Sequence, residues 1–335
     1  MWVKKVLVIR FSSFGDVVQA TTVNHQLRGL FPEAKIVWLT KSAFSSLVQK
    51  DPNVDQVINL EDFSSLLSLA SWIKSESFNL IYDAHKSMRS SLLFFLSKVI
   101  FDKSSWVRRS KSRLKRFLLF KFRINLFPKP FVGQASYISP LLEYGLKLVP
   151  NDTKWNFSDS EVKKVKDHVG ERDFVVLAPS AAWEMKRWPV DHWKKLITNF
   201  TTKFPEVSIV ITGGPSDEFT KELEIEKNVI NLAGKLSLSE SSCLVTLAKC
   251  TVSADTGIIH VVDAHQNKGV LLNGPTAFGK TFSPSIKILE AGLYCQPCSK
   301  DGRGKCHRET YQLCMVEISV NQVMNEISVL ISSPS

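Results

Sequence analysis

The sequence alternates twice between short apolar runs rich in Val, Ile and Leu and longer segments with helical periodicity. In the first half, the predicted strands are 3–9, 35–39, 54–60 and 78–83, separated by predicted helices 17–30, 42–49 and 63–75. Apolar runs of this kind are typical of strands buried on both faces of a parallel sheet. Strands that alternate with helices therefore predict a doubly wound α/β sheet.

The alternation restarts after a polar stretch, 148–159, which is the best linker candidate. The predicted strands there are 174–178, 207–212, 229–231, 251–253 and 269–273, and the predicted helices are 189–204, 217–226, 239–249 and 258–264. With 335 residues the chain is long enough for two cores. We therefore expect two α/β domains, 1–155 and 156–318, and a closing amphipathic helix within 319–335.

Positive charge is concentrated in one segment. The formal net charge is +11, and residues 98–129 hold eleven Lys or Arg against one acid, Asp102. Aromatic residues are dense across 94–129, and 113–123 has the pattern of a basic amphipathic helix that rests on an anionic membrane or holds an acidic substrate. A solvated helix face is the alternative. We do not expect a nucleic-acid partner, because no known nucleic-acid module accompanies the basic segment.

The lengths of the apolar runs indicate where in the cell the protein is expected. The first ten residues contain too short an apolar run for a signal peptide, and no uncharged apolar run of about eighteen residues is present. We expect a cytoplasmic protein, in which disulfides are uncommon.

The turn after the first predicted strand is the first candidate site. It reads Arg-Phe-Ser-Ser-Phe-Gly-Asp and ends at Asp16. Ligands of open α/β sheets bind at the carboxyl ends of the strands. Asp16 there is either a general base that takes a proton from a bound hydroxyl or an ordinary acid at a helix start.

Two turns in the second half are further candidates. Ser180 and Lys186 lie in the turn after strand 174–178, where they are suited to a phosphate, although a surface lysine is the alternative. Asp217 and Glu218 follow a Gly-Gly-Pro turn, where they either accept hydrogen bonds from a ribose or base, or cap a helix.

The turn 253–260 unites several features of an anion site. Asp255, Thr256 and Gly257 lie between a predicted strand end and a predicted helix start, and His260 follows one turn later. The first N–H groups of a helix have no partner within it, and the helix dipole adds positive charge there. A simple helix cap is the alternative interpretation.

Residues 274–281 match the P-loop pattern G-x-x-x-x-G-K-[ST]. A P-loop requires a long helix directly afterwards, whereas Pro284 stops any helix within one turn. The match therefore does not favour a P-loop. A phosphotransferase that uses Gly274–Thr281 is kept only as an alternative function, and a non-enzymatic basic binding protein is a second alternative.

Four cysteines gather near the carboxyl end: Cys295, Cys298, Cys306 and Cys314. They are either ligands of a structural zinc ion or reduced, packed thiols, since only one pair has the C-x-x-C spacing of a zinc knuckle. The sequence contains no D-x-D triplet, so a metal bridge to a diphosphate has no obvious ligands.

Taken together, these stretches resemble glycosyltransferase family 9, the lipopolysaccharide heptosyltransferases. The resemblance covers nearly the whole chain: the first turn ending at Asp16, Lys-Arg-Trp-Pro, the Gly-Gly-Pro turn, Asp-Thr-Gly-x-x-His, Asn-Gly-Pro-Thr and the Cys-x-Pro-Cys tail. It implies a GT-B fold, with two Rossmann-like domains facing across a cleft. It also implies an inverting, metal-independent reaction without a cofactor, at the inner face of the inner membrane.

The resemblance also implies a nucleotide-sugar donor such as ADP-heptose, and a lipid-linked Kdo or heptose acceptor. Asp16 becomes the general base, and the donor site comprises Ser180, Lys186, Asp217, Glu218, Asp255, Thr256, Gly257 and His260. For the acceptor we expect Ser13, Gly15, His85, Arg113 and Arg116, together with a peripheral contact to the membrane.

Overall fold

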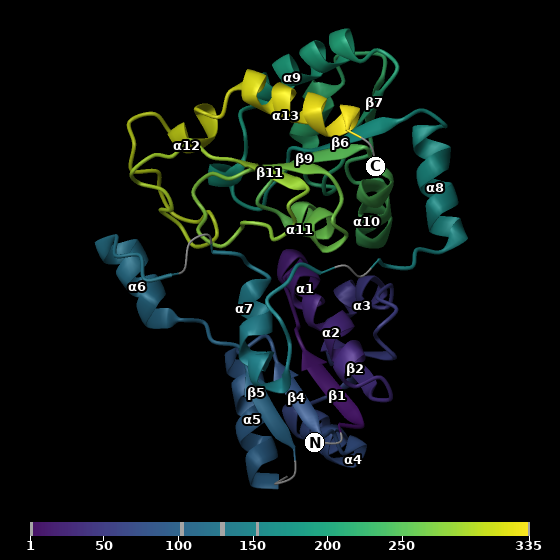
Figure 1. Ribbon diagram of the computed structural model, residues 1–335, viewed down its shortest axis with the longest axis vertical. Coiled ribbons are helices and arrows are strands. Elements are labelled where there is room, and N and C mark those ends of the chain that lie inside the picture. Colours follow the sequence, from purple (N-terminus) through teal and green to yellow (C-terminus); the bar gives the residue numbers. More distant parts are fainter. Residues whose placement is uncertain (1–2, 101–103, 128–130, 152–153, 334–335) are drawn as a thin grey trace. The chain divides into compact units, whose positions relative to one another are not determined.

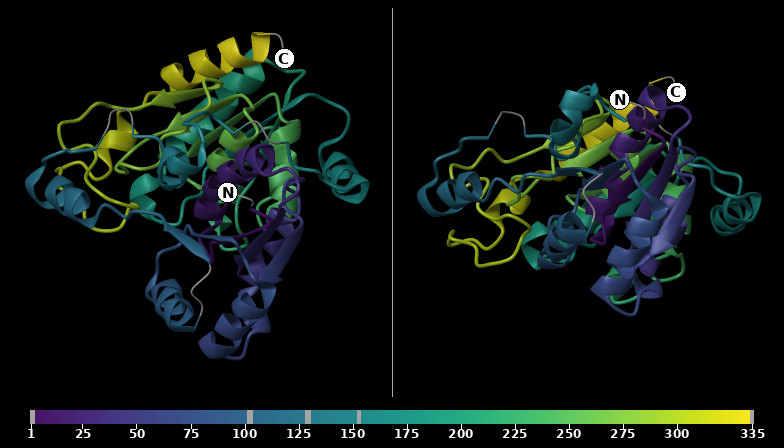
Figure 2. Two further views of the ribbon diagram at one scale, coloured as in Figure 1. Left: turned by 60° about the horizontal axis from the view of Figure 1, so that its bottom comes forward. Right: turned by 90° about the horizontal axis from the view of Figure 1, so that it is seen from below.

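The computed structural model describes residues 3–100, 104–127, 131–151 and 154–333 (Figure 1). The chain divides into two compact units, which are Met1–Ser112 with Gln134–Asn156, and Arg113–Gly133 with Phe157–Ser335. Each unit contains one parallel sheet with helices packed against it (Figure 2). The sheets match the predicted doubly wound α/β class.

The sheet of the first unit has five parallel strands in the order β3-β2-β1-β4-β5. The strands are β1 (Lys5–Ile9), β2 (Lys35–Thr40), β3 (Gln56–Asn59), β4 (Leu80–Asp83) and β5 (Ser105–Arg108). In the register of the sheet, Ile9 lies beside both Leu39 and Asp83. The turn that follows Ile9 and the carboxylate of Asp83 therefore lie at the same edge of the sheet.

Helices cover this sheet because its strands are apolar on both faces. The helices of the first unit are α1 (Phe14–Ala20), α2 (Thr22–Leu30), α3 (Ser42–Val48), α4 (Leu66–Glu76), α5 (Met88–Ile100) and α7 (Ala135–Ile138), with 3₁₀ turns Leu60–Asp62 and Ser139–Tyr144. One core forms where Leu7 and Ile81 of the sheet pack with Leu69 of α4 and Leu93 of α5. This packing holds the carboxyl edge of the sheet in place.

Two predictions for the first unit are wrong in detail. The single helix predicted over 17–30 is two helices, α1 and α2, which meet at Thr21, whose hydroxyl donates to the carbonyl of Val18 at 2.7 Å. The sequence pattern also missed α5 and β5, because basic and aromatic residues there obscure the apolar periodicity.

The sheet of the second unit has six parallel strands in the order β11-β10-β9-β6-β7-β8. The strands are β6 (Phe174–Ala178), β7 (Ser208–Ile211), β8 (Val229–Asn231), β9 (Cys250–Ala254), β10 (Gly269–Leu272) and β11 (Ile286–Leu289). The chain runs outward from β6 to β8 and then returns to β9 on the other side of β6. The carboxyl ends of β6 and β9 therefore form the switch point at which such sheets bind ligands.

Helices α9 and α13 lie on one side of this sheet, and α10 and α11 lie on the other (Figure 1). The helices are α8 (Asp159–Val169), α9 (Val190–Lys203), α10 (Leu238–Leu247), α11 (Gly257–Ala264), α12 (Leu313–Val316) and α13 (Val320–Ser332), with 3₁₀ turns Glu184–Lys186 and Glu218–Leu223. The helix predicted over 217–226 is thus only a 3₁₀ turn, and α8 and β11 are not predicted by the sequence pattern.

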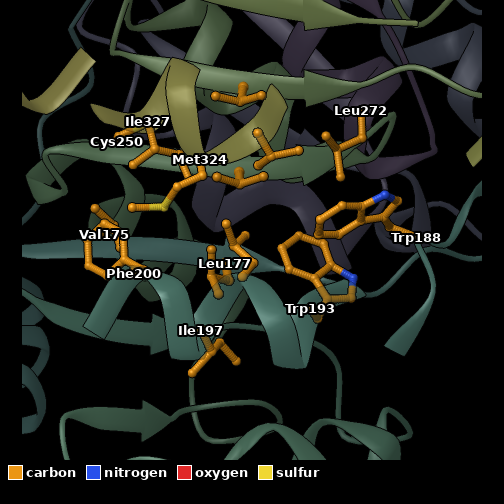
Figure 3. Packing of buried hydrophobic residues seen from close by; sticks show 14 of the residues in the cluster. Val175, Leu177, Trp188, Trp193, Ile197, Phe200, Cys250, Leu272, Met324 and Ile327 are labelled. Atoms are coloured by element: carbon orange, nitrogen blue, oxygen red, sulfur yellow. The ribbon is translucent and has the colours of Figure 1, made fainter. Parts of the chain in front are cut away.

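The largest core lies between the sheet and the helices α9 and α13 (Figure 3). Trp188 and Trp193 pack edge to face with ring centroids 5.0 Å apart. The indole N–H of Trp188 donates to the carbonyl of Ile318 at 2.9 Å, so this buried polar atom is satisfied. The predicted closing helix is therefore an integral part of the second unit.

The predicted basic and aromatic segment 94–129 is divided: its residues up to Ser112 belong to the first unit as predicted, whereas Arg113–Gly133, which contains the rest, belongs to the second. Arg123 donates to the carbonyl of Pro297 at 3.1 Å, and Val132 pairs with Lys280 in an isolated β-bridge. Aromatic rings explain the difference, because Phe131 packs against Phe278 at 4.8 Å, a contact that local sequence patterns do not reveal.

Part of this segment forms the predicted basic helix, α6 (Arg113–Phe122). Residues 101–103 and 128–130 of the segment predicted as basic and aromatic, 152–153 of the predicted linker and 334–335 of the predicted final element lie outside the described residues. Within the described ranges, no helix is both long and apolar enough to cross a membrane.

Candidate active site

Asp16 lies in the first turn of α1, directly after the carboxyl end of β1, and its carboxylate is the centre of a polar cluster. Arg10 lies 2.5 Å from one carboxylate oxygen, and the Tyr137 hydroxyl donates to the other at 2.7 Å. Ser13 donates to Asp16 at 3.2 Å, and Arg109 approaches to 4.0 Å. The Asp16 side chain remains 39% exposed, so a substrate hydroxyl can reach it.

These neighbours determine the ionisation of Asp16. Burial alone would raise the pKa of Asp16, but the charges of Arg10 and Arg109 and the hydrogen bonds from Tyr137 and Ser13 outweigh it. The net effect lowers the pKa from 3.8 to about 2. Asp16 is therefore a carboxylate at every physiological pH, with both oxygens engaged.

The residues expected to bind the acceptor divide between the two units. Ser13 and Gly15 flank the start of α1, and His85 lies beside the same edge, with its ring 5.0 Å from that of Phe11. Burial, with the nearby charges of Arg10 and Lys111, lowers the pKa of His85 to about 4, so its ring is neutral near pH 7.

Arg113 and Arg116 lie on α6 in the second unit, whereas Asp16 lies in the first unit. The guanidinium of Arg116 lies over the Phe278 ring at 4.5 Å. The prediction groups these two arginines with Asp16 because it places the basic segment in the first domain.

Sequence reasoning missed three residues around Asp16. Arg10 is buried and also donates to the carbonyl of Ala84 at 2.9 Å. Arg109 lies over the Tyr137 ring at 3.6 Å. Arg10 at the strand end is a usable signal, since it ends an apolar run, but Tyr137 is more than a hundred residues away and no local pattern connects it to Asp16.

In the second unit, Asp255 follows β9 and is the centre of a second polar cluster at the switch point. The Lys186 ammonium contacts the backbone carbonyl of Asp255 and lies 3.3 Å from its carboxylate. His260 Nε2 lies 3.4 Å from the other carboxylate oxygen. Burial raises the pKa of Asp255, but Lys186, His260 and a hydrogen bond from Thr276 together hold it well below its ordinary range.

The predicted anion site lies at the start of α11. Thr256 is the N-cap residue in extended conformation, yet its hydroxyl interacts with that of Ser253 at 2.9 Å and does not cap the helix. The first N–H groups of α11 are therefore available to an anionic ligand, with Gly257 at the first helical position. The ammonium of Lys186 is held beside them through Asp255.

Two buried polar atoms of these predicted donor-site residues, Ser180 Oγ and His260 Nδ1, have no hydrogen-bond partner among the described residues. A Cβ placed on Gly213 would lie 3.0 Å from Ser180 Oγ and 3.1 Å from the carboxylate of Asp217. The structure therefore brings both Ser180 and Asp217 to Gly213. Glu218, in contrast, is exposed at the first position of a 3₁₀ turn.

Glycines allow this cluster to pack closely. A Cβ on Gly279 would lie 2.2 Å from the carboxylate carbon of Asp255, and one on Gly302 would lie 2.6 Å from the side chain of Lys186. No real Cβ approaches another atom so closely, so both positions require glycine. The loops that carry these glycines form the walls around the Lys186–Asp255 pair.

The P-loop interpretation of Gly274–Thr281 is wrong. No helix follows Lys280 and Thr281, and the next regular element is the strand β11. The Lys280 ammonium pairs with Glu290 at 2.8 Å, and Thr276 contributes its hydrogen bond to Asp255. The segment therefore supports the Asp255 cluster from one side.

All four carboxyl-terminal cysteines are free thiols. Burial, together with the charges of the other three, raises the pKa of the Cys314 thiol to about 12. No group of three or more His, Cys, Asp or Glu side chains in the described ranges is arranged to hold a metal ion. The influence of Cys295, Cys298 and Cys306 on Cys314 places the four thiols near one another, and a zinc site there stays a prediction.

Comparison with known proteins identifies one family for this chain. A sequence model of glycosyltransferase family 9 (heptosyltransferase) matches residues 66–307. Lipooligosaccharide heptosyltransferase 2 of Haemophilus influenzae is 23% identical over 299 residues, which cover 81% of this chain and 84% of that protein.

Solved structures agree on the fold. A glycosyltransferase family 9 structure from Veillonella parvula superposes with a TM-score of 0.75 at 17% identity and covers 98% of this chain and 97% of that one. An E. coli ADP-heptose lipopolysaccharide heptosyltransferase II superposes with a TM-score of 0.73 at 20% identity and covers 98% of both chains. The predicted GT-B fold class is confirmed.

Proposed function

This chain belongs to glycosyltransferase family 9, the heptosyltransferases, and from that membership we propose that it adds a heptose to a lipid-linked sugar during assembly of the lipopolysaccharide core. The prediction of an enzyme is confirmed, and a non-enzymatic binding protein is excluded by the family. The proposed donor is ADP-heptose, the sugar nucleotide after which the similar E. coli enzyme is named.

The anion site at the start of α11 carries this proposal. A diphosphate needs hydrogen-bond donors and positive charge, and the N–H groups of Thr256 and Gly257 with the Lys186 ammonium supply both. Ser180 Oγ and His260 Nδ1, which lack partners among the described residues, are two further groups for the phosphates and the adjoining ribose. Asp217 is the proposed acceptor for ribose hydroxyls.

In the proposed mechanism, the acceptor hydroxyl attacks the anomeric carbon in a single displacement. A bond forms from the hydroxyl oxygen to that carbon while the bond to the diphosphate breaks, so the configuration inverts. Asp16 takes the hydroxyl proton, and ADP leaves with the bonding electron pair. Lys186 and the N–H groups of α11 stabilise the charge that develops on the diphosphate.

We further propose that the reaction needs no metal ion and no cofactor. Lys186 supplies the positive charge that a divalent cation would otherwise bring to the diphosphate, and the sequence has no D-x-D triplet to hold such a cation. A chelator such as EDTA should then leave the rate of transfer unchanged.

The acceptor proposed is a Kdo- or heptose-bearing lipid at the inner face of the inner membrane, with the protein in the cytoplasm. Ser13, Gly15 and His85 around Asp16 are the proposed acceptor contacts. Helix α6, with Arg113 and Arg116, supports a peripheral contact to an anionic membrane, because exposed apolar side chains alternate there with cations.

A panel of nucleotide sugars tests this function by thermal stabilisation and by sugar transfer. A ligand that binds only the folded protein raises its apparent stability. We expect ADP-heptose to raise the melting temperature more than UDP- or GDP-linked sugars, and to yield ADP in the presence of a lipid-linked acceptor. Equal stabilisation by all nucleotides, without transfer, would contradict the proposal.

A further inference from the structure

A cavity of about 510 Å³ lies in the second unit, beyond the carboxyl ends of β10 and β11. Its walls come from the 273–280 loop, from residues 290–297 and from the 113–133 segment. This volume falls in the range of about 300–1,000 Å³ that is usual for small-molecule sites. None of the residues assigned above to the diphosphate or the acceptor lines it.

The polar side of the cavity is a small network with no net charge. Glu290 accepts hydrogen bonds from the amide of Asn273 and, at 2.8 Å, from the ammonium of Lys280. Gln296 donates to the carbonyl of Gly274 at 2.8 Å. A carboxylate has about four acceptor positions, so Glu290 retains the capacity to accept from ligand hydroxyls.

Aromatic side chains also line the cavity. Phe278 is the central ring, with Phe131 at 4.8 Å and Phe127 at 5.3 Å, both edge to face. Arg116 covers Phe278 at 4.5 Å. Phe127, Phe131 and Phe278 line the same cavity as the carboxylate of Glu290 and the amides of Asn273 and Gln296.

The loop 273–280 connects this cavity to the Asp255 cluster. Thr276, which lines the cavity, hydrogen-bonds Asp255, and Gly279 packs directly on the Asp255 carboxylate. The cavity lies on the β10–β11 side of the switch point, whereas Gly213 and Asp217 lie on the β7 side. A diphosphate at α11 therefore has a site on each side of it.

We propose that this cavity binds a neutral sugar ring through adjacent hydroxyl groups. Sugar hydroxyls both donate and accept, which matches Glu290 as acceptor and Lys280 and the amides as donors, while the carbon-bound face of the ring packs on Phe278. An acyl chain would leave the Lys280–Glu290 pair desolvated without compensation. An anionic group would meet the carboxylate of Glu290 and would have to compete with it for the ammonium of Lys280.

The inference rests on the proposed function in one respect only, the molecule that carries the sugar. That sugar is either the heptose of the donor or an uncharged sugar unit of the acceptor. Two variants test the cavity itself, Glu290→Gln and Phe278→Leu, which remove the charged acceptor and the aromatic face with little change of volume. Glu222→Gln is the matched control, since Glu222 pairs with Lys194 at 2.9 Å on an exposed surface. Thermal unfolding of each free variant reports whether it folds.

The first measurement uses neutral methyl glycosides and saturation-transfer NMR, and it does not depend on catalysis. We expect transfer from the wild-type protein and from Glu222→Gln, and loss of the signal in folded Glu290→Gln or Phe278→Leu. No transfer to any glycoside from the wild type, or signals unchanged in both cavity variants, would overturn the inference.

The second measurement identifies the source by calorimetric titration of the same variants with ADP, ADP-heptose and a lipid-free acceptor oligosaccharide. Loss of a hydrogen bond to a charged group weakens binding by about tenfold or more. A selective loss for ADP-heptose assigns the donor sugar, and a selective loss for the oligosaccharide assigns the acceptor. If the variants lose as much affinity for ADP, which carries no heptose, as for ADP-heptose, the cavity is not a sugar site. If wild-type protein binds glycosides but not ADP-heptose, the proposed function fails while the sugar site stands.

Discussion

At Asp16 the balance between burial and neighbouring charge determines what the carboxylate can do. Arg10 and Tyr137 hold its two oxygens, so the side chain is oriented before any substrate arrives. The same contacts lower its pKa to about 2 and make it a weak base in the free enzyme. Proton transfer from a hydroxyl becomes favourable only as that oxygen bonds to the anomeric carbon, so base catalysis and bond formation must be concerted.

The variant Asp16→Asn keeps the shape of the side chain and removes its charge. We expect kcat to fall about 10²–10⁴-fold, the usual contribution of a general base, with donor affinity unchanged. Steady-state kinetics and ADP-heptose titration measure the two quantities. Asp62→Asn, a change at an exposed 3₁₀ turn of the same unit, is the control, and wild-type turnover in Asp16→Asn would disprove the assignment.

The pH dependence follows from the direction of the same shift. A carboxyl whose folded pKa lies below its unfolded value stabilises the fold above about pH 4, and this contribution is lost as pH falls through about 2. Asp16 and His85 therefore do not titrate between about pH 5 and pH 8. A pH–rate profile should lack an acid limb from either group. If the wild-type rate falls below about pH 6 and this fall is absent in Asp16→Asn, the pKa of Asp16 is much higher than about 2.

Gly279→Ala tests the packing of the anion site. The added methyl would lie 2.2 Å from the Asp255 carboxylate carbon, so Asp255 and its partner Lys186 must move. We expect ADP affinity to fall about tenfold or more, because a displacement of this size disrupts charge-assisted contacts. Isothermal titration with ADP measures the loss. Gly29→Ala, in helix α2 with no atom near the added methyl, should bind ADP as the wild type does.

At the scale of single elements, α6 carries the proposed membrane contact. Leu114 and Phe117 are three residues apart, share one face of the helix and are at least half exposed, whereas Leu119 on the opposite side is buried. Cations at Arg113 and Lys121 accompany this apolar face. Such a helix lies in the membrane interface with its apolar side inward.

Replacing Leu114 and Phe117 with Ser should therefore weaken binding to vesicles that contain phosphatidylglycerol. Each apolar side chain contributes about 1.5–3 kcal/mol when fully buried, so the pair should lower partitioning at least about tenfold. Vesicle sedimentation at low and high salt measures it. Val329→Ser, a similarly exposed apolar position on α13, is the control, and equal sedimentation of all three proteins would contradict the contact.

Sequence patterns predict elements well where burial alone decides the structure. β6 and β8 have the predicted bounds, and most other strands differ from the prediction by no more than two residues at either end. The pattern fails at β5, where Arg108 pairs with the buried Asp83, and at the break between α1 and α2. In both places specific polar contacts, and not apolar periodicity, determine the backbone.

The sequence predicts the residues of the candidate site where they lie close together along the chain. Asp255, Thr256, Gly257 and His260 lie in one turn, so spacing alone groups them. The Tyr137 contact to Asp16 joins residues on distant parts of the chain, and neither its distance nor its effect on the pKa has a local signature. The resemblance to a family supplies the roles of these residues, which the kinetic variants above must test.

At the scale of the whole molecule, the chain crosses between its two units three times, near residues 112, 133 and 156. The sequence predicts the basic segment between the first two crossings within the first domain, because domains are usually continuous in sequence. Aromatic contacts from Phe131 to Phe278 outweigh that rule. The family match over 66–307 spans all three crossings.

Because segments of the two units alternate along the chain, a unit cannot be exchanged between relatives by a single cut in the sequence. A chimera that joins the first half of this chain to the second half of a relative, cut once near residue 156, would transplant Arg113–Gly133 away from the Phe278 ring and the Lys280 bridge that hold it. A functional exchange of units needs the basic segment to travel with the second unit. Transfer of the second unit is therefore coupled to a segment that lies, in sequence, between two parts of the first unit.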